Sequence, residues 1–199
     1  MSARNSPDLY QLPDVPAGPR VGARIAFVRA NALTPFVTFL DAIGAPVNSL
    51  LSQARVSPSL LRASEALLPI VAAYRFTELV ARREQLEDLG IVIGQRASAF
   101  DLGEYGAVLQ HAANVYEYLQ IGIRLIGGHS GGTRFWLQAE DDAFRVNQYL
   151  AGPPGLGRCI GDLYTLVITI SMLRRMIGPA WSPGEERGSV VTMSSGTLH

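Results

Sequence analysis

The first two-thirds of the chain carries apolar residues at helical spacing, broken by short turns. Leu33, Phe36 and Leu40 mark one side of a helix that should end near Gly44. Later helix starts are marked by prolines, which are well tolerated in a first helical turn: Pro46, Pro58 and Pro69. The pattern therefore predicts a series of helices, with the longest running from Pro69 to about Gly90. Further helices are expected over residues 91–97, 105–112 and 115–126.

The pattern changes after a glycine-rich segment, residues 127–132. Apolar and polar residues then alternate with a period of two over residues 133–139 and again over 144–150, with Asp141-Asp142 between them. This alternation predicts two antiparallel strands joined as a hairpin. A last helix is expected from about Cys159 to Ile177, and it is apolar on most faces. Such a helix must be covered on both sides, by the sheet and by either the helical layer or a second subunit.

These elements predict an α+β fold: a mostly helical first two-thirds, then a small antiparallel hairpin or sheet packed against a long apolar helix. With 199 residues, of which 48% are hydrophobic, the chain is long enough for one good core. We expect one domain over residues 25–183. The polar, Pro-rich segment 1–24 and the small, polar segment 184–199 are predicted to be disordered.

Charge and cysteine content narrow the class of protein. Seventeen basic residues, all arginine, balance seventeen acidic ones, so the chain has no net charge to attract nucleic acid or anionic lipid. The single Cys159 cannot form an intrachain disulfide, and the first twenty residues lack the apolar segment of a signal peptide. The run 163–173 is too short to cross a bilayer. These features favour a cytoplasmic protein with no membrane partner.

One segment matches the G-x-S-x-G pattern of serine hydrolases, with Ser130 in the place of the nucleophile. In those enzymes a strand precedes the serine and a helix follows it. Here the predicted order is helix, then strand, so the hydrolase is kept only as a remote alternative. The three histidines are too far apart, and too isolated from thiols and carboxylates, to indicate a metal site. We therefore expect a protein that is not an enzyme and that uses no metal or cofactor.

Two further patterns bear on binding. Residues 50–61 resemble a helix-turn-helix, but the second helix would offer only Arg62 to a DNA groove, so a packed helical corner is the simpler interpretation. Trp136, Tyr149 and Tyr164 are candidates for lining a ligand cavity between the sheet and the last helix. The alternative is that these aromatic residues simply fill the core.

Several short motifs occur in a characteristic order. They are the segments 39–46 (FLDAIGAP), 50–51 (LL), 56–61 (VSPSLL), 69–74 (PIVAAY), 89–94 (LGIVIG), 101–109 (DLGEYGAVL) and 176–183 (MIGPAWSP). In this order and spacing, over about residues 25–183, they resemble the N-terminal arabinose-binding-type domain of AraC/XylS-family transcription regulators. The branch resembled begins with a helical region instead of a cupin barrel.

The resemblance implies a non-catalytic domain that senses a small-molecule effector and dimerises. The family name does not assign a sugar as the effector, and no effector-contacting residues are carried over. Family members continue into two DNA-binding helix-turn-helix motifs, which residues 184–199 do not match. The resemblance therefore predicts a domain without its DNA-binding half. An alternative is an interaction protein that forms heterodimers with full-length regulators through the last helix.

Overall fold

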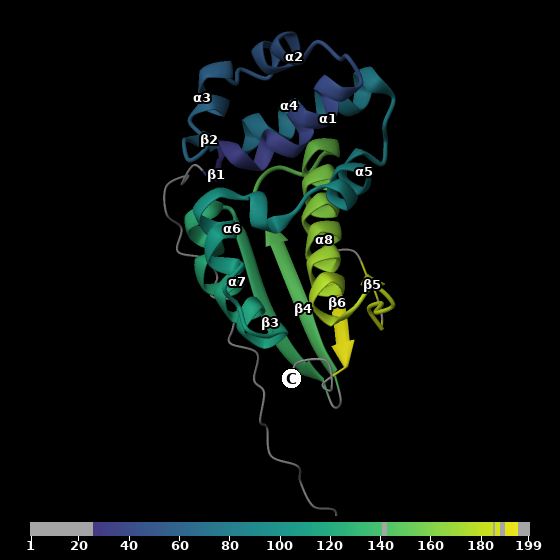
Figure 1. The fold of residues 1–199 in the computed structure, drawn as a ribbon. Helices are drawn as coiled ribbons and strands as arrows, with labels where there is room; N and C mark the ends of the chain where they lie inside the picture. Colours follow the sequence, from purple (N-terminus) through teal and green to yellow (C-terminus); the bar gives the residue numbers. More distant parts are fainter. Residues whose placement is uncertain (1–25, 141–142, 185, 188–189, 195–199) are drawn as a thin grey trace, which may run out of the picture.

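The computed structural model describes residues 26–140, 143–184, 186–187 and 190–194. Figure 1 shows helices gathered at one end of the molecule, a sheet at the other, and one long helix running between them. The α+β prediction is confirmed. The elements of the helical end are β1 (Phe27–Arg29), a 3₁₀ helix (Ala30–Leu33), α1 (Thr34–Ala42), α2 (Val47–Gln53), α3 (Pro58–Arg62), β2 (Leu67–Pro69), α4 (Ile70–Glu84) and α5 (Leu89–Arg96). The elements that follow are a second 3₁₀ helix (Ala99–Asp101), α6 (Gly103–Leu109), α7 (Val115–His129), β3 (Thr133–Glu140), β4 (Ala143–Leu150), α8 (Leu156–Ile177), β5 (Glu186–Arg187) and β6 (Val190–Ser194).

Local signals set several helix boundaries. The Ser57 side chain accepts a hydrogen bond from the backbone N–H of Ser59 and so caps α3. At the start of α7, Asn114 Oδ1 accepts from the Glu117 N–H at 2.9 Å, and Glu117 Oε2 accepts from the Ala113 N–H at 2.7 Å. These reciprocal bonds satisfy backbone donors that a helix start leaves without partners.

The longest predicted helix, Pro69 to Gly90, is two helices in the structure. Pro69 is the N-cap of α4 and not its first helical residue. Gln85 then adopts a left-handed backbone conformation, with φ of 55°, which ends α4. Glycine at position 90 lies inside α5 and ends no helix. The prediction of one continuous helix was therefore wrong, because a non-glycine residue makes the turn.

The predicted hairpin is present, and it is part of a larger sheet. β3 and β4 pair antiparallel from Thr133 opposite Leu150 to Glu140 opposite Ala143. β6 then pairs antiparallel with β4, and the strand order is β3-β4-β6-β5. β5 and β6 lie in the segment 184–199, which we predicted from the sequence to be disordered. The other predicted disordered segment, 1–24, lies outside the described residues.

The position of β6 has a physical reason. A two-stranded hairpin leaves the outer edge of β4 with free backbone N–H and C=O groups, and a further strand can satisfy them. Val190, Val191 and Thr192 are β-branched residues of the kind enriched in strands. Their clustering could have indicated a strand, but we predicted disorder because the surrounding segment is polar.

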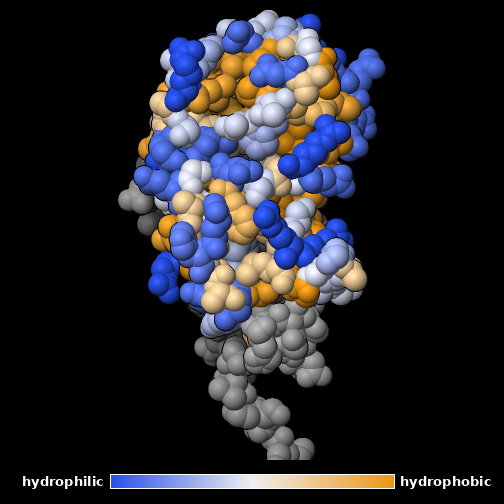
Figure 2. All heavy atoms as spheres, in the orientation of Figure 1, coloured by the Kyte–Doolittle hydropathy of each residue, from blue (hydrophilic) through white to orange (hydrophobic). Residues whose placement is uncertain are grey.

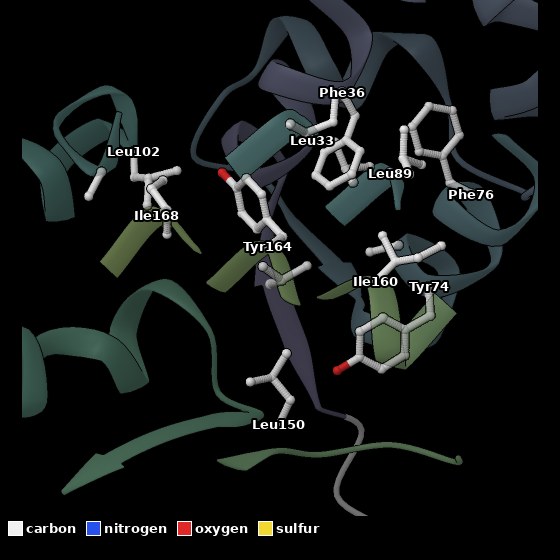
Figure 3. Close-up of a cluster of buried hydrophobic side chains, with 14 of the residues drawn as sticks. Leu33, Phe36, Tyr74, Phe76, Leu89, Leu102, Leu150, Ile160, Tyr164 and Ile168 are labelled. Carbon is white, nitrogen blue, oxygen red and sulfur yellow. The ribbon is translucent and has the colours of Figure 1, made fainter. Parts of the chain in front are cut away.

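Helix α8 forms the centre of the core. It packs against α4 and α5 on one side and against α7, β4 and β6 on the other. The helical layer is thus the second cover that the apolar helix was expected to need. By length and composition alone α8 could also cross a membrane; 44% of its apolar window is buried within the fold. Figure 3 shows Ile160 and Tyr164 of this helix within the buried cluster, near Phe36 and Leu89.

Glycines allow α8 to approach its neighbours closely. A Cβ atom on Gly157 would collide with the backbone carbonyl of Tyr74 in α4, and one on Gly90 would collide with the Ile160 carbonyl. A Cβ on Gly94 would lie 2.8 Å from the Cβ of Val167. Backbone-to-backbone contact of this kind leaves no room for a side chain.

The face drawn in Figure 2 is mixed in polarity: apolar side chains gather mainly over the helical end, with charged side chains between them. The exposed large apolar residues of that end are Ile43, Leu67 and Val71, each about half exposed.

We expect Gly157→Ala to destabilise the fold by about 3 kcal/mol, because the new methyl group must displace the backbone of α4. The matched control is Gly127→Ala in α7, where nothing lies within 4 Å of the added carbon. That variant should gain about 0.5–1 kcal/mol through helix propensity. Urea unfolding followed by circular dichroism measures both. Similar stabilities for the two variants would contradict the close packing of α8 against α4.

Candidate functional site

A cavity lies where the helical end, α8 and the sheet meet. The cavity has a volume of about 120 Å³, well above the roughly 10–15 Å³ that one buried water molecule requires. Its walls come from β1, the first 3₁₀ helix, α1, α4, α6, α7, β3, β4 and α8. Apolar side chains dominate, among them Leu33, Ile70, Ile126 and Ile168. A predominantly apolar cavity enclosed by several elements is the usual form of a small-molecule site.

Hydroxyl groups are spread through these walls, and most of them already donate to protein acceptors. On α8, Thr165 donates to the Gly161 carbonyl and Thr169 to the Thr165 carbonyl, each at 2.8 Å. On α4, Thr77 donates to the Tyr74 carbonyl at 3.0 Å. Such bonds keep the donors paired within their own helices.

Two lining side chains carry buried polar atoms without a hydrogen-bond partner. They are the hydroxyl of Tyr164 and Nδ1 of His129; the two residues are 8% and 5% exposed. Burial raises the pKa of Tyr164 above its ordinary value, so this hydroxyl remains a donor. In Figure 3, Tyr164 lies at the centre of the buried cluster, and its ring is 5.1 Å from that of Phe36. An unpaired buried polar atom costs about 1–3 kcal/mol, which a suitable ligand can recover.

His129 is the last residue of α7, and its environment favours the neutral imidazole. Burial lowers its pKa to about 4, an effect that the Glu65 carboxylate opposes and the Arg29 guanidinium reinforces. The ring stacks on Tyr105, with the centroids 5.2 Å apart. A neutral histidine offers one donor and one acceptor nitrogen.

Arg29 and Glu65 bind the elements beside the cavity to one another. Arg29 donates to the Gly128 carbonyl at 2.9 Å and to the Glu65 carbonyl at 2.8 Å, and it pairs with the Glu65 carboxylate at 3.2 Å. The same carboxylate accepts from Asn31 Nδ2 and from the Glu104 N–H. Neither charged residue lines the cavity. The pair fixes β1 and α6 against the end of α7 and leaves the cavity walls uncharged.

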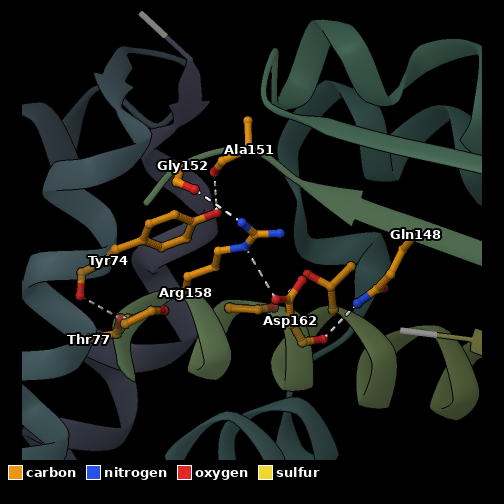
Figure 4. A network of polar contacts seen from close by, with 10 residues as sticks. Tyr74, Thr77, Gln148, Ala151, Gly152, Arg158 and Asp162 are labelled. Atoms are coloured by element: carbon orange, nitrogen blue, oxygen red, sulfur yellow. Dashed lines mark hydrogen bonds and ion pairs between the residues drawn. The ribbon is translucent and has the colours of Figure 1, made fainter. Parts of the chain in front are cut away.

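A second polar network connects β4 to α8, as Figure 4 shows. Tyr74 donates to the Ala151 carbonyl at 2.9 Å, and Arg158 donates to the Gly152 carbonyl at 3.1 Å. Arg158 also pairs with Asp162 at 3.6 Å. The bonds from Tyr74 and Arg158 give hydrogen-bond partners to two backbone carbonyls in the turn between β4 and α8.

The three aromatic residues suggested by the sequence lie in different places. Tyr164 lines the cavity. Trp136 and Tyr149 are 43% and 47% exposed and do not line it, and the guanidinium of Arg158 lies over the Tyr149 ring. The period of two in β3 accounts for Trp136, because it puts this residue on the opposite face from the buried Thr133 and from Phe135, which do line the cavity.

Sequence reasoning identified only Tyr164 among the lining residues and missed the others, including Tyr105, Tyr118 and His129. Tyr118 is spaced with Val115 and Leu119 on the buried face of α7, so helical periodicity could have identified it. His129 lies on the same face, three residues after the buried Ile126, but the predicted helix ended at residue 126 and so left it out.

Ser130 lacks the surroundings of a hydrolase nucleophile. Its hydroxyl donates to the Phe27 carbonyl at 3.4 Å and accepts from Thr133 Oγ1 at 2.7 Å. α7 precedes it and β3 follows, as the sequence predicted. Among the described residues, no group of three or more His, Cys, Asp or Glu side chains could hold a metal ion.

The segment that resembles a helix-turn-helix forms α2, a turn at Arg55 and α3. α3 has only five residues, and α2 buries Val47, Leu50 and Leu51 against the rest of the helical end. A helix of five residues is about 7.5 Å long, too short to present a reading face to the major groove. The packed helical corner is the better description.

The pKa of His129 predicts a specific pH dependence of stability. Above pH 6.5 the residue is neutral in both the folded and the unfolded chain, and the pKa has no effect. As the pH falls towards 4, the unfolded chain binds a proton that the folded chain does not, so the folded state loses stability. His129→Phe should remove a loss of about 2 kcal/mol between pH 7 and pH 5, measured by urea unfolding. His111→Gln, which replaces an exposed histidine, should retain that loss. Identical pH profiles for His129→Phe and the unmodified chain would contradict the buried, neutral state.

Comparison with known proteins identifies the family of the chain. A family model described as the arabinose-binding domain of AraC transcription regulator, N-terminal, matches residues 44–185. The match includes α2 to α8 and most of the cavity-lining elements. A search of curated proteins found no match. Because the family model matches well over half of the chain, the protein belongs to the family of N-terminal arabinose-binding domains of AraC transcription regulators.

Proposed function

We propose that this chain is a non-catalytic sensory domain that binds a small-molecule effector in the cavity around α8. The observation that carries the proposal is the cavity itself, which combines apolar walls with two unpaired polar side chains, His129 and Tyr164. Family membership supports a ligand-sensing, regulatory role. The engaged hydroxyl of Ser130 supports a role without catalysis.

The position of the cavity suggests how an effector would act. Its walls come from both the helical end and the sheet, so a bound molecule would contact elements that otherwise meet mainly through α8. Binding therefore favours the arrangement in which those walls are correctly spaced. A regulator uses such a difference in affinity between conformations to change its activity.

Dimerisation is a further part of the proposal, and it rests on the family resemblance. α8, the helix first considered as a pairing surface, is packed by α4, α5 and the sheet, so pairing would use another face. Light scattering over a range of concentrations measures the oligomeric state. A strictly monomeric chain would remove both homodimerisation and heterodimer formation from the proposal. A cytoplasmic location likewise stays a prediction.

Thermal unfolding with a broad panel of small metabolites tests effector binding. A compound at a hundredfold excess over its Kd stabilises the fold by about 2.7 kcal/mol, a rise of roughly 5–10 °C in Tm for a domain of this size. Ala73→Leu, which places a larger side chain in the cavity wall, should abolish the rise. Ala107→Leu, the same change at an exposed position of α6, should retain it.

The two variants also define the results that would count against binding in the cavity. A compound that stabilises the Ala73→Leu and Ala107→Leu variants as strongly as the unmodified chain would bind elsewhere. That outcome, or a panel without any stabilising compound, would contradict the proposed role of the cavity.

A further inference from the structure

The chemistry of the cavity wall limits the kind of molecule it can accept. Among the residues that the structure describes, no arginine, aspartate or glutamate lines it, and its histidine is neutral. A carboxylate, phosphate or ammonium group would lose its hydration there without gaining an opposite charge. Arg29 and Glu65, beside the cavity, form an ion pair with each other. The cavity therefore suits an uncharged molecule.

Hydrogen-bonding capacity limits the ligand further. The hydroxyls of Thr165, Thr169, Thr77 and Thr133 all donate to acceptors within the protein. Tyr74 also donates to the protein, to the Ala151 carbonyl. A sugar carries several hydroxyl groups, each of which would need a partner in place of water. Walls whose donors are mostly engaged can still accept hydrogen bonds, but they offer few free donors to the oxygen atoms of a sugar.

A few side-chain groups remain for a ligand with few polar atoms. The Tyr164 hydroxyl and Nδ1 of His129 have no partner, the Tyr118 hydroxyl makes no hydrogen bond to another described residue, and all three residues line the same cavity. A single ligand hydroxyl can accept a hydrogen bond from one group and donate to another. The remaining ligand surface would lie against apolar side chains such as Leu33 and Ile126. These walls continue into a smaller hollow of about 30 Å³ that shares Tyr105, Tyr118 and Phe135 with the cavity.

We propose that the effector is an uncharged, mainly apolar small molecule with one or two polar atoms, held by hydrogen bonds to Tyr164 and His129. Free sugars and carboxylates are excluded. This inference rests on the proposed function, because it describes the ligand of the same cavity. It follows from the uncharged cavity wall and from the polar groups that the cavity leaves unpaired.

Isothermal titration calorimetry with four defined probes tests the ligand class. The probes are p-cresol, toluene, 4-hydroxybenzoate and L-arabinose. p-Cresol differs from toluene by one hydroxyl and from 4-hydroxybenzoate by exchange of a methyl group for a carboxylate. We expect p-cresol to bind about 25-fold more tightly than toluene, about fivefold for each of two net hydrogen bonds. 4-Hydroxybenzoate and L-arabinose should show no binding.

Variants assign the hydrogen bonds. Tyr164→Phe should reduce the affinity for p-cresol about fivefold, by the value of one hydrogen bond, and leave toluene binding unchanged. His129→Phe provides a second variant in case the first fails to fold. Tyr149→Phe, which removes an exposed tyrosine hydroxyl outside the cavity, should bind both probes like the unmodified chain.

The outcomes separate this inference from the proposed function. Binding of L-arabinose or 4-hydroxybenzoate that Ala73→Leu abolishes would overturn the ligand class and leave the cavity as the effector site. Equal affinities for p-cresol and toluene, or no binding of either, would also overturn the class. Binding that Ala73→Leu leaves intact would count against the cavity itself.

Discussion

The close approach of α8 to α4 and α5 is the constraint on which the rest of the structure depends. Glycines at 90, 94 and 157 let the helices meet almost backbone to backbone. That contact fixes the helical end against the central helix, while β4 and α7 pack on the other side. The cavity lies where these layers meet, so its shape follows from how close the helices lie. A side chain at any of the three glycines would change the position of the cavity walls.

Charged groups lie outside the cavity, and the groups that line it are uncharged. Charged residues are paired outside it, in the Arg29–Glu65 pair at one side and the Arg158–Asp162 pair at the other. Inside it, burial keeps His129 neutral and the Tyr164 hydroxyl protonated. The result is an apolar chamber with few free hydrogen-bonding groups. In the proposed function, such a chamber would bind charged or polyhydroxylated molecules weakly, because it cannot replace the water that they lose.

Much of the fold was predictable from the sequence because its elements have strong periodic patterns. The helices of the first two-thirds, the hairpin over 133–150 and the last helix follow directly from periods of 3.6 and 2. The break at Gln85 was missed because the left-handed turn uses a residue other than glycine. The pairing of β6 with β4 was missed because it depends on a free sheet edge, which a local pattern does not record.

The candidate site was predictable only in part. Tyr164 was identified because the last helix had to face the sheet, but Tyr105 and His129 come from segments brought together by tertiary packing. No local pattern gives that arrangement. Intermolecular nuclear Overhauser effects between bound p-cresol and isoleucine methyl groups would test the central claim most directly. The account predicts contacts to Ile70, Ile126 and Ile168, which line the cavity, and none to the exposed Ile43. Contacts to Ile43 without contacts to the other three would contradict it.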